Sequence, residues 1–350
     1  MKHIRPGEFV LARPAIIRAR TVDAMMTYDQ RTIDSTGAFL IGELERLDQT
    51  LHMPLVSVTW SRDIDLREDV SVADETSSFT NSTFAAAGGV TPAGKSWIGK
   101  DANAIGSVSL DIGKTANPLY LWGQEIKWTL PELESAQKLG RPIDNQMYEG
   151  LKLKHNMDID EMVYVGDSTL GHYGLVNNST KVTNIINVAN GAASSPLWEN
   201  KTPDEILTDV NELLASVWAA SAWAVIPTQL RLPPTKYAYL VANKVSDAGN
   251  VSILEFLRQN NLAKANGQEL NIQPLKWLNG RGSGGTPGDT STSNRMVAYT
   301  KDPQRVRFPM TPLQRTPLEY RSLYQMTTYY GRLGVVEMVY PETVGYRDAL

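Results

Sequence analysis

Residues 160–178 read DEMVYVGDSTLGHYGLVNN, and this stretch admits two interpretations. An apolar run that ends in Gly166-Asp167-Ser168 is typical of a strand leading into a reactive serine. Its glycines, Gly166, Gly171 and Gly174, are equally typical of a structural turn. The choice between them decides whether the chain is an enzyme or a building block.

The interpretation of Ser168 as a reactive serine fails because no histidine is placed in the sequence where the base is expected. Gly166-Asp167-Ser168 resembles the first block of the Gly-Asp-Ser esterases and lipases. A serine hydroxyl needs a neighbouring base, which in that family is a histidine close to the end of the domain. No histidine follows His172, which stands only four residues after Ser168. We therefore expect a structural turn and no enzyme activity, with hydrolysis through Ser168 kept as an alternative.

Nucleotide-binding motifs are incomplete in this chain. Gly166 and Gly171 have the spacing of a phosphate loop, but His172 and Tyr173 stand where lysine and serine or threonine are required. The glycines of GRGSGG (280–285) match a dinucleotide fingerprint, yet the polar run TPGDTSTSN follows in place of a helix. We predict no cofactor.

The candidate metal ligands in the sequence match no known metal-binding pattern. The chain has no cysteine and four histidines, none at a zinc spacing. A small acidic cluster consists of Asp158, Asp160, Glu161 and Asp167, but its register does not fit a calcium loop. We predict no metal site and interpret the cluster as a solvated helix end. Asp158 and Asp160 would oppose the helix dipole there unless another chain supplied a cation.

Composition limits the classes of partner. The 350 residues are 42% hydrophobic, which is ample for a packed core, and the formal net charge is −4. Such a chain has no basic field to hold a nucleic-acid backbone, so we expect only indirect contact with DNA. The most apolar run, Leu213 to Ile226, is shorter than the roughly 20 residues of a membrane-spanning helix. We expect no membrane segment and no signal peptide, and zero cysteines suit a reducing cytoplasm.

Period-two alternation predicts several strands. It occurs at Val56–Trp60, continues from Ile64 to Val72, and returns at Val108–Ile112 and Trp122–Trp128. Residues 75–103 between them are rich in Ser, Thr, Ala and Gly and contain almost no core residues. Because long loops without a core are rare in compact domains, we expect this segment to pack against a surface outside its own domain.

Helix signals are clearest where a capping box opens an apolar stripe. Thr129 to Glu132 and Thr202 to Glu205 both have this pattern. The sequence also predicts a long helix from Ile143 to about Met162 and a short one around Ile253–Arg258, with strands at Ala222–Ile226 and Tyr237–Val241 and a loop at 279–294.

Taken together, the order of elements resembles the major capsid proteins of tailed phages with the Hong Kong 97-like fold, in the branch related to encapsulins. The features that carry the resemblance are Glu161, Gly166, Gly171, Gly174 and Leu175, and the C-terminal set Arg332, Gly334, Val335, Pro341, Tyr346 and Asp348. The resemblance covers most of the chain from about residue 50 onward.

The resemblance implies an α+β chain with four parts. These are an N-terminal arm (1–54), an extended loop (55–118), a peripheral domain with a long spine helix (119–169 and 331–350), and an axial domain (170–330). It further implies self-assembly through pentamers and hexamers into an icosahedral shell around double-stranded phage DNA. An encapsulin-type compartment that encloses an enzyme is the alternative. The implied location is the virion, with assembly in the host cytoplasm.

Contacts between subunits are expected from a charged stretch in the extended loop. Arg62, Asp63, Asp65, Arg67, Glu68 and Asp69 alternate in sign along one candidate strand. They could set the register between neighbouring subunits through complementary charge, or they could form a solvated strand face. Both readings stay open.

Other partners and modifications follow from the same resemblance. Portal, scaffold and decoration proteins are possible partners, and packaged DNA is an indirect one. Some relatives join their subunits through a lysine–asparagine bond. Lys95 and Lys100 lie in the expected loop, but the tail has no matching asparagine, so we predict no such crosslink.

Overall fold

The computed structural model describes residues 56–86, 108–139, 143–246, 250–280 and 294–350. The chain divides into two units, Met1–Met53 and Pro54–Leu350, and every described residue belongs to the second. The expected arm (1–54), Lys95, Lys100 and most of the 279–294 loop therefore lie outside the described residues. The described chain mixes helices with sheets, which confirms the α+β class.

A five-stranded sheet forms one core, with the strand order β5-β14-β8-β6-β7. Its strands are β5 (Ile185–Asn187), β6 (Gln229–Leu232), β7 (Asn271–Pro274), β8 (Arg295–Tyr299) and β14 (Val344–Asp348). β14 is parallel to β5 and antiparallel to β8, and β6 is antiparallel to β8 and parallel to β7. Every residue of β8 and β14 is buried, as expected for strands covered on both faces.

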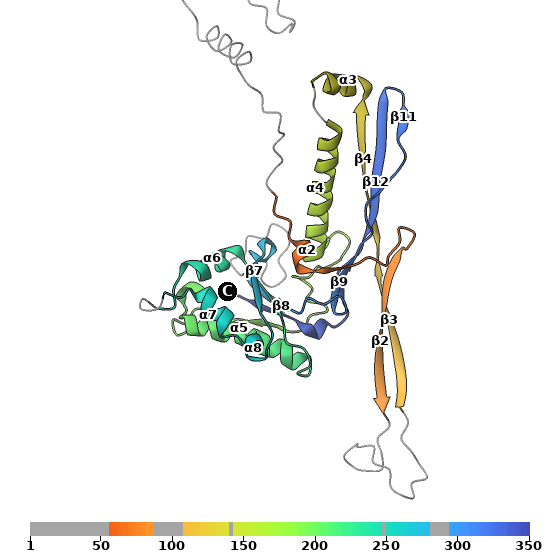
Figure 1. The fold of residues 1–350 in the computed structure, drawn as a ribbon. Coiled ribbons are helices and arrows are strands. Elements are labelled where there is room, and N and C mark those ends of the chain that lie inside the picture. The colour runs from red at the N-terminus through yellow and green to blue at the C-terminus, as the bar shows by residue number, and fades with distance from the viewer. Residues whose placement is uncertain (1–55, 87–107, 140–142, 247–249, 281–293) are drawn as a thin grey trace, which may run out of the picture. The chain divides into compact units, whose positions relative to one another are not determined.

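Helices surround this sheet (Figure 1). They are α5 (Pro203–Ala220), α6 (Pro234–Ala242), α7 (Ile253–Gln259) and α8 (Leu262–Ala265), with the short 3-10 turns η2 (Trp198–Asn200), η3 (Lys276–Leu278) and η5 (Pro341–Thr343). The predicted capping box at Thr202 and Glu205 opens α5. The apolar stripe of α5, from Ile206 to Val217, is fully buried and packs against β8 and β14.

A second sheet is built on two long antiparallel strands, β4 (Tyr120–Thr129) and β12 (Tyr324–Leu333). β10 (Gln314–Arg315) and β11 (Glu319–Arg321) pair with the other edge of β12. Beside it stand α3 (Leu130–Leu139) and the predicted long helix α4 (Ile143–Tyr164) (Figure 1). Thr129 and Glu132 exchange the hydrogen bonds of a capping box at the start of α3.

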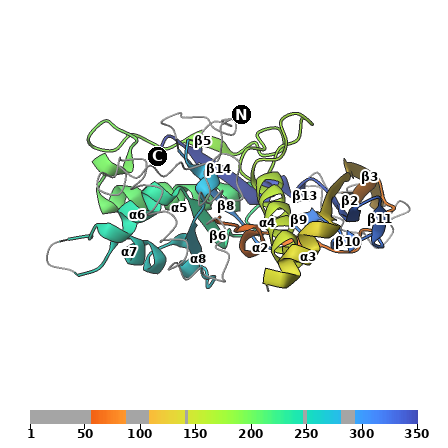
Figure 2. The ribbon, with the colours of Figure 1, turned by 90° about the horizontal axis from the view of Figure 1, so that it is seen from above.

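A smaller sheet, β1-β9-β13, lies at the junction of these parts. Its strands are β1 (Asp65–Arg67), β9 (Val306–Pro309) and β13 (Glu337–Met338). The preceding helix α2 (Trp60–Asp63) packs against α4, as Figure 2 shows. Tyr299 of β8, Phe308 of β9 and Leu333 of β12 belong to one buried cluster, so a continuous core joins the two larger sheets through the small one.

The remaining strands form a ribbon of their own. β2 (Thr76–Ala86) and β3 (Val108–Pro118) pair antiparallel over their full lengths. Within the described ranges they pair only with each other, and Figure 1 shows the ribbon standing apart from the helices.

Three predicted strands are wrong. Residues 56–59 are irregular and Trp60–Asp63 is helical, because bonds to distant residues replace a ladder there. Tyr237–Val241 lies in α6, which begins at Pro234 in the first helical turn. Ala222–Ile226 forms a turn after α5, with Ala222 and Trp223 at positive φ. The strands at 108–112 and 122–128 and the helices at 143–162, 202–218 and 253–258 are confirmed.

Two of the sheets join strands that lie far apart in the chain. β10 to β12 (314–333) share a sheet with β4, whereas β14 shares one with β8. The division of the chain into an arm, an extended loop, a peripheral domain and an axial domain stays a prediction.

Candidate assembly site

The β2–β3 ribbon exposes an apolar face. Val108, Leu110 and Ile112 alternate along β3 and are 71%, 52% and 61% exposed. An isolated two-stranded ribbon is at best marginally stable in water. The apolar face of this ribbon is exposed, so burial within its own chain does not stabilise it. The ribbon therefore has the properties of a surface that another molecule covers.

A buried carboxylate anchors the base of this ribbon. Glu337 on β13 is fully buried, and it accepts a hydrogen bond from Ser77 Oγ on β2. Arg307 Nε donates to Glu337 Oε2 at 2.7 Å, and Arg67 Nη1 lies 3.3 Å from both carboxylate oxygens. Arg67 also donates to the carbonyl of Ser78. One carboxylate thus ties the ribbon to all three strands of the small sheet.

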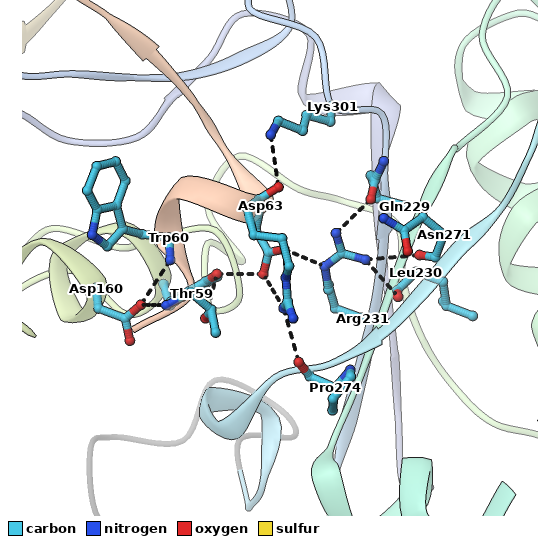
Figure 3. Close-up of polar contacts among 12 residues, drawn as sticks. Thr59, Trp60, Asp63, Asp160, Gln229, Leu230, Arg231, Asn271, Pro274 and Lys301 are labelled. Atoms are coloured by element: carbon cyan, nitrogen blue, oxygen red, sulfur yellow. Dashed lines mark hydrogen bonds and ion pairs between the residues drawn. The ribbon is translucent and has the colours of Figure 1, made fainter. Parts of the chain in front are cut away.

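A second network ties α2 to α4 and to β6 of the five-stranded sheet (Figure 3). Asp63 is fully buried and accepts hydrogen bonds from Arg231 Nε at 2.9 Å and from Arg62 Nε at 2.7 Å. Tyr164 Oη on α4 donates to the same carboxylate at 2.5 Å. Burial and the Asp63 carboxylate raise the pKa of Tyr164, so this phenol stays a donor.

Arg231 completes that network on β6. Its remaining N–H groups donate to Gln229 Oε1 at 2.6 Å, to the Asn271 carbonyl at 2.9 Å and to the Leu230 carbonyl (Figure 3). A buried charge is tolerated only when it is paired and hydrogen-bonded, and both conditions are met here.

Asp160 fixes the chain just before α2. Its Oδ1 accepts the backbone N–H groups of Thr59 and Trp60, as Figure 3 shows. Its Oδ2 accepts Trp277 Nε1 at 2.7 Å and lies 3.1 Å from Lys276 Nζ. The interpretation of this cluster as a solvated helix end is wrong for Asp160, which is fully buried, and no other chain is needed to supply a cation there. Lys276 supplies it for Asp160, and Lys154 does so for Asp158.

The six predicted contact residues do not form one strand face. Arg62 and Asp63 lie in α2, Asp65 and Arg67 in β1, and Glu68 and Asp69 in the loop that follows. The carboxylate of Asp63 is enclosed within its own chain, so no part of it is left for a neighbour. Glu68 and Asp69 are exposed, and the contact role of the exposed residues stays a prediction.

Gly166, Gly171 and Gly174 lie in the segment that leaves α4. Gly166 and Gly171 have φ of 75° and 71°, which residues with a Cβ rarely adopt. A Cβ on Gly174 would lie 2.3 Å from the carbonyl carbon of Tyr164, so the chain passes too close for any side chain. His172 Nε2 is hydrogen-bonded to Tyr120 Oη at 2.5 Å, and the described chain shows no hydrogen bond between the His172 ring and the Ser168 hydroxyl.

The described ranges hold no group of three or more acidic or histidine side chains placed to bind a metal ion. They also contain no helix that is both long enough and apolar enough to cross a membrane.

Sequence reasoning missed the residues that anchor the ribbon and α2. Ser77, Arg307 and Glu337 are far apart in the chain, as are Asp63 and Arg231. No local pattern marks them, because each is an ordinary polar residue until the fold buries it.

Comparisons with known proteins agree on the kind of molecule. No curated protein matches the sequence. Among solved structures, the capsid of Myoviridae phage XM1 is similar with a TM-score of 0.67 and 18% identity, over 88% of this chain and 98% of that chain. A chain in a structure of Microbacterium phage Oxtober96 is similar with a TM-score of 0.56 and 12% identity, over 86% of this chain and 92% of that one. The capsid of an empty GTA particle has a TM-score of 0.54 and 14% identity, over 90% and 97%.

The sequence itself identifies the family. The family model described as major capsid protein matches residues 94–350. Members of this family are structural proteins of the virion and not enzymes, so neither the hydrolase nor the encapsulin alternative is favoured. The chain belongs to the major capsid protein family and has the Hong Kong 97-like fold of tailed-phage capsids, as the resemblance predicted.

Proposed function

We propose that this chain assembles through pentamers and hexamers into an icosahedral shell that encloses double-stranded phage DNA. The observation that carries the proposal is the exposed apolar face of Val108, Leu110 and Ile112 on a ribbon without a core. Covering that face with neighbouring copies removes apolar surface from water, at roughly 25 cal/mol per Å². Many such modest contacts make a closed shell cooperative.

The anchor at Glu337 has a clear role in this scheme. A ribbon that is covered only after assembly must already point in a defined direction beforehand, because ordering it later would weaken each contact. Three hydrogen-bond donors on one buried carboxylate hold its base in place. Portal, scaffold and decoration proteins are further proposed partners, packaged DNA is an indirect one, and assembly takes place in the host cytoplasm.

Asp65, Arg67, Glu68 and Asp69 are proposed as contacts that set the register between copies, together with the exposed part of Arg62. Arg67 and Asp69 are paired with each other at 2.7 Å, so a neighbour would meet a preformed ion pair rather than free charges. Such contacts act more on register and specificity than on affinity.

Electron microscopy of purified protein tests the proposal. Ile112→Asp places a charge on the apolar face, and we expect it to abolish particles while circular dichroism shows a folded chain. Asn81→Asp adds the same charge to the opposite face, because Asn81 pairs with Gly113, and we expect particles to form. Uniform shells from Ile112→Asp would show that this face is not covered by neighbouring copies.

A further inference from the structure

The sheet of β4 and β12 carries a groove of about 580 Å³ on the face that packs against α3 and α4. Ile126 and Trp128 of β4 lie opposite Thr327 and Gln325 of β12 on this face, and all four side chains line the groove. The two helices contact β4, which Figure 1 shows between α4 and β12. The helices therefore leave the part of this face over β12 open to another molecule.

The lining of the groove offers a hydrogen-bond donor and a positive charge, and it contains no carboxylate. Trp128 is 8% exposed, and its Nε1–H has no hydrogen-bond partner in the described chain. An indole nitrogen can only donate, and a buried donor without a partner is destabilising. Arg315 is exposed and forms no ion pair with an acidic residue of the described ranges. The groove therefore favours an occupant with negative charge and hydrogen-bond acceptors.

The donor and the charge stand at different ends of the groove. Trp128 pairs with Gln325, whereas Arg315 pairs with Tyr329, four residues further along β12. At about 3.3 Å per residue, these positions are roughly 13 Å apart along the strand. An extended peptide of about five residues covers this length. Apolar side chains for such a peptide to contact are those of Leu133, Leu313 and Leu318, the last of which is 39% exposed.

The β2–β3 ribbon of the chain itself does not meet these requirements. Asp111 alternates with Leu110 and Ile112 along β3, so its carboxylate lies on the face opposite the apolar one. Lys114 shares the face of Ile112 and would bring a second positive charge toward Arg315. Apolar side chains and negative charge in one extended segment therefore indicate a different polypeptide.

We propose that this groove binds an extended acidic peptide of a separate partner protein. A carboxylate of the peptide pairs with Arg315, a backbone carbonyl accepts the hydrogen bond from Trp128 Nε1, and apolar side chains cover Leu133, Leu313 and Leu318. β12 is paired along both edges, so the peptide lies over side chains and does not extend the sheet. The proposal does not depend on shell formation, because all the lining residues come from one copy.

Fluorescence polarisation of the full-length chain with labelled heptapeptides tests the proposal. The probes alternate leucine, threonine and valine and carry two glutamates at the amino end or at the carboxyl end. Matched probes carry lysines in place of the glutamates. We expect one acidic probe to bind at least about tenfold more tightly than its lysine counterpart, because complementary charge determines which partner is accepted. If neither acidic probe binds, the proposal is overturned.

Variants of the same sheet locate the binding. Arg315→Glu should weaken binding of the acidic probe about tenfold, whereas Arg321→Glu, at an exposed arginine of β11 outside the groove, should change it less than about twofold. Trp128→Phe keeps an aromatic ring and removes the donor, and we expect about fivefold weaker binding by a chain that thermal unfolding shows to be folded. Equal affinities in the two arginine variants would overturn the proposal.

Ile112→Asp distinguishes this proposal from shell formation. We expect the variant to bind the acidic probe as the parent chain does, even though it forms no particles. Tighter binding by the variant would show that the ribbon of a neighbouring copy fills the groove, and would overturn the proposal. Binding by the parent chain that weakens as the protein concentration rises would assign the groove to a second copy, with the same consequence.

Discussion

Asp63 Oδ1 accepts a hydrogen bond from Arg231 Nε at 2.9 Å across 168 residues of sequence, and both side chains are fully buried. This pair connects α2, at the entry of the described chain, to β6 in the five-stranded sheet. Breaking it leaves an uncompensated charge in the core. The network therefore holds α2 and α4 against the five-stranded sheet.

Asp63→Asn tests this pair. The amide has nearly the same shape but leaves Arg231 without a counter-charge, so we expect a loss of about 3–5 kcal/mol in the free energy of unfolding. Urea titration of unassembled protein measures it. Asp302→Asn breaks the partly exposed pair with Arg305 and should cost about 1 kcal/mol or less. Similar losses from both variants would contradict the prediction.

Three glycines form a graded test of the chain path after α4. Gly174→Ala places a Cβ within 2.5 Å of backbone atoms of Tyr164 and Val165, so we expect misfolding. Gly171→Ala meets no atom within 4 Å and pays only for positive φ, about 1–2 kcal/mol. Gly150→Ala lies in open space within α4 and should stabilise by about 0.5–1 kcal/mol. Soluble yield and thermal unfolding rank the three, and any other order would show that this path is wrong.

His155 should make stability fall in mild acid. It is buried against Trp122, its Nε2 has no hydrogen-bond partner in the described chain, and burial lowers its pKa. The unfolded chain, with a histidine pKa of about 6.5, binds the proton more readily than the folded one. Stability from this group is complete above that pH and declines as the pH falls toward the folded-state value.

The measurement is the slope of unfolding free energy between pH 7 and pH 5. We expect a smaller slope in His155→Phe than in the parent chain, whatever the absolute stability of the variant. Asp158 opposes the shift, since its carboxylate favours the charged imidazole, so Asp158→Asn should steepen the slope. Identical slopes in all three proteins would exclude His155 as the source.

Glu337→Gln should loosen the ribbon while leaving the larger sheets in place. Arg67, Arg307 and Ser77 lose a shared carboxylate, at a cost on the order of 3 kcal/mol. Hydrogen exchange locates the change, and amide protection should fall at Ser77 and Ser78 but not in the buried turns of α5. A uniform loss of protection would mean that Glu337 supports the whole fold instead.

The elements that the sequence predicts best are determined by interactions between residues that are close together in the chain. Thr202 and Glu205 satisfy each other's backbone groups within one turn, and α4 needs only a long run of helix-forming residues. The failures have tertiary causes. Residues 56–60 alternate as a strand would, yet Asp160 binds the N–H groups of Thr59 and Trp60 and the chain turns into α2.

The candidate site is predictable in one part only. The poor core content of 75–103 indicated a segment that needs outside cover, and the exposed ribbon begins there. The hydrogen bond that anchors the base of the ribbon could not be predicted from the sequence, because Glu337 and Ser77 are 260 residues apart and meet only in the folded chain. The same holds for Asp63, whose neighbours in sequence suggested a solvated face.

The position of β14 in its sheet determines what a truncated chain lacks. β14 is the last strand in chain order, yet it lies between β5 and β8, and all its residues are buried. A chain cut before Val344 therefore lacks the strand that lies between β5 and β8 and leaves one edge of each unpaired. Open strand edges pair readily with other chains, so we expect such a fragment to aggregate rather than to fold around the remaining strands.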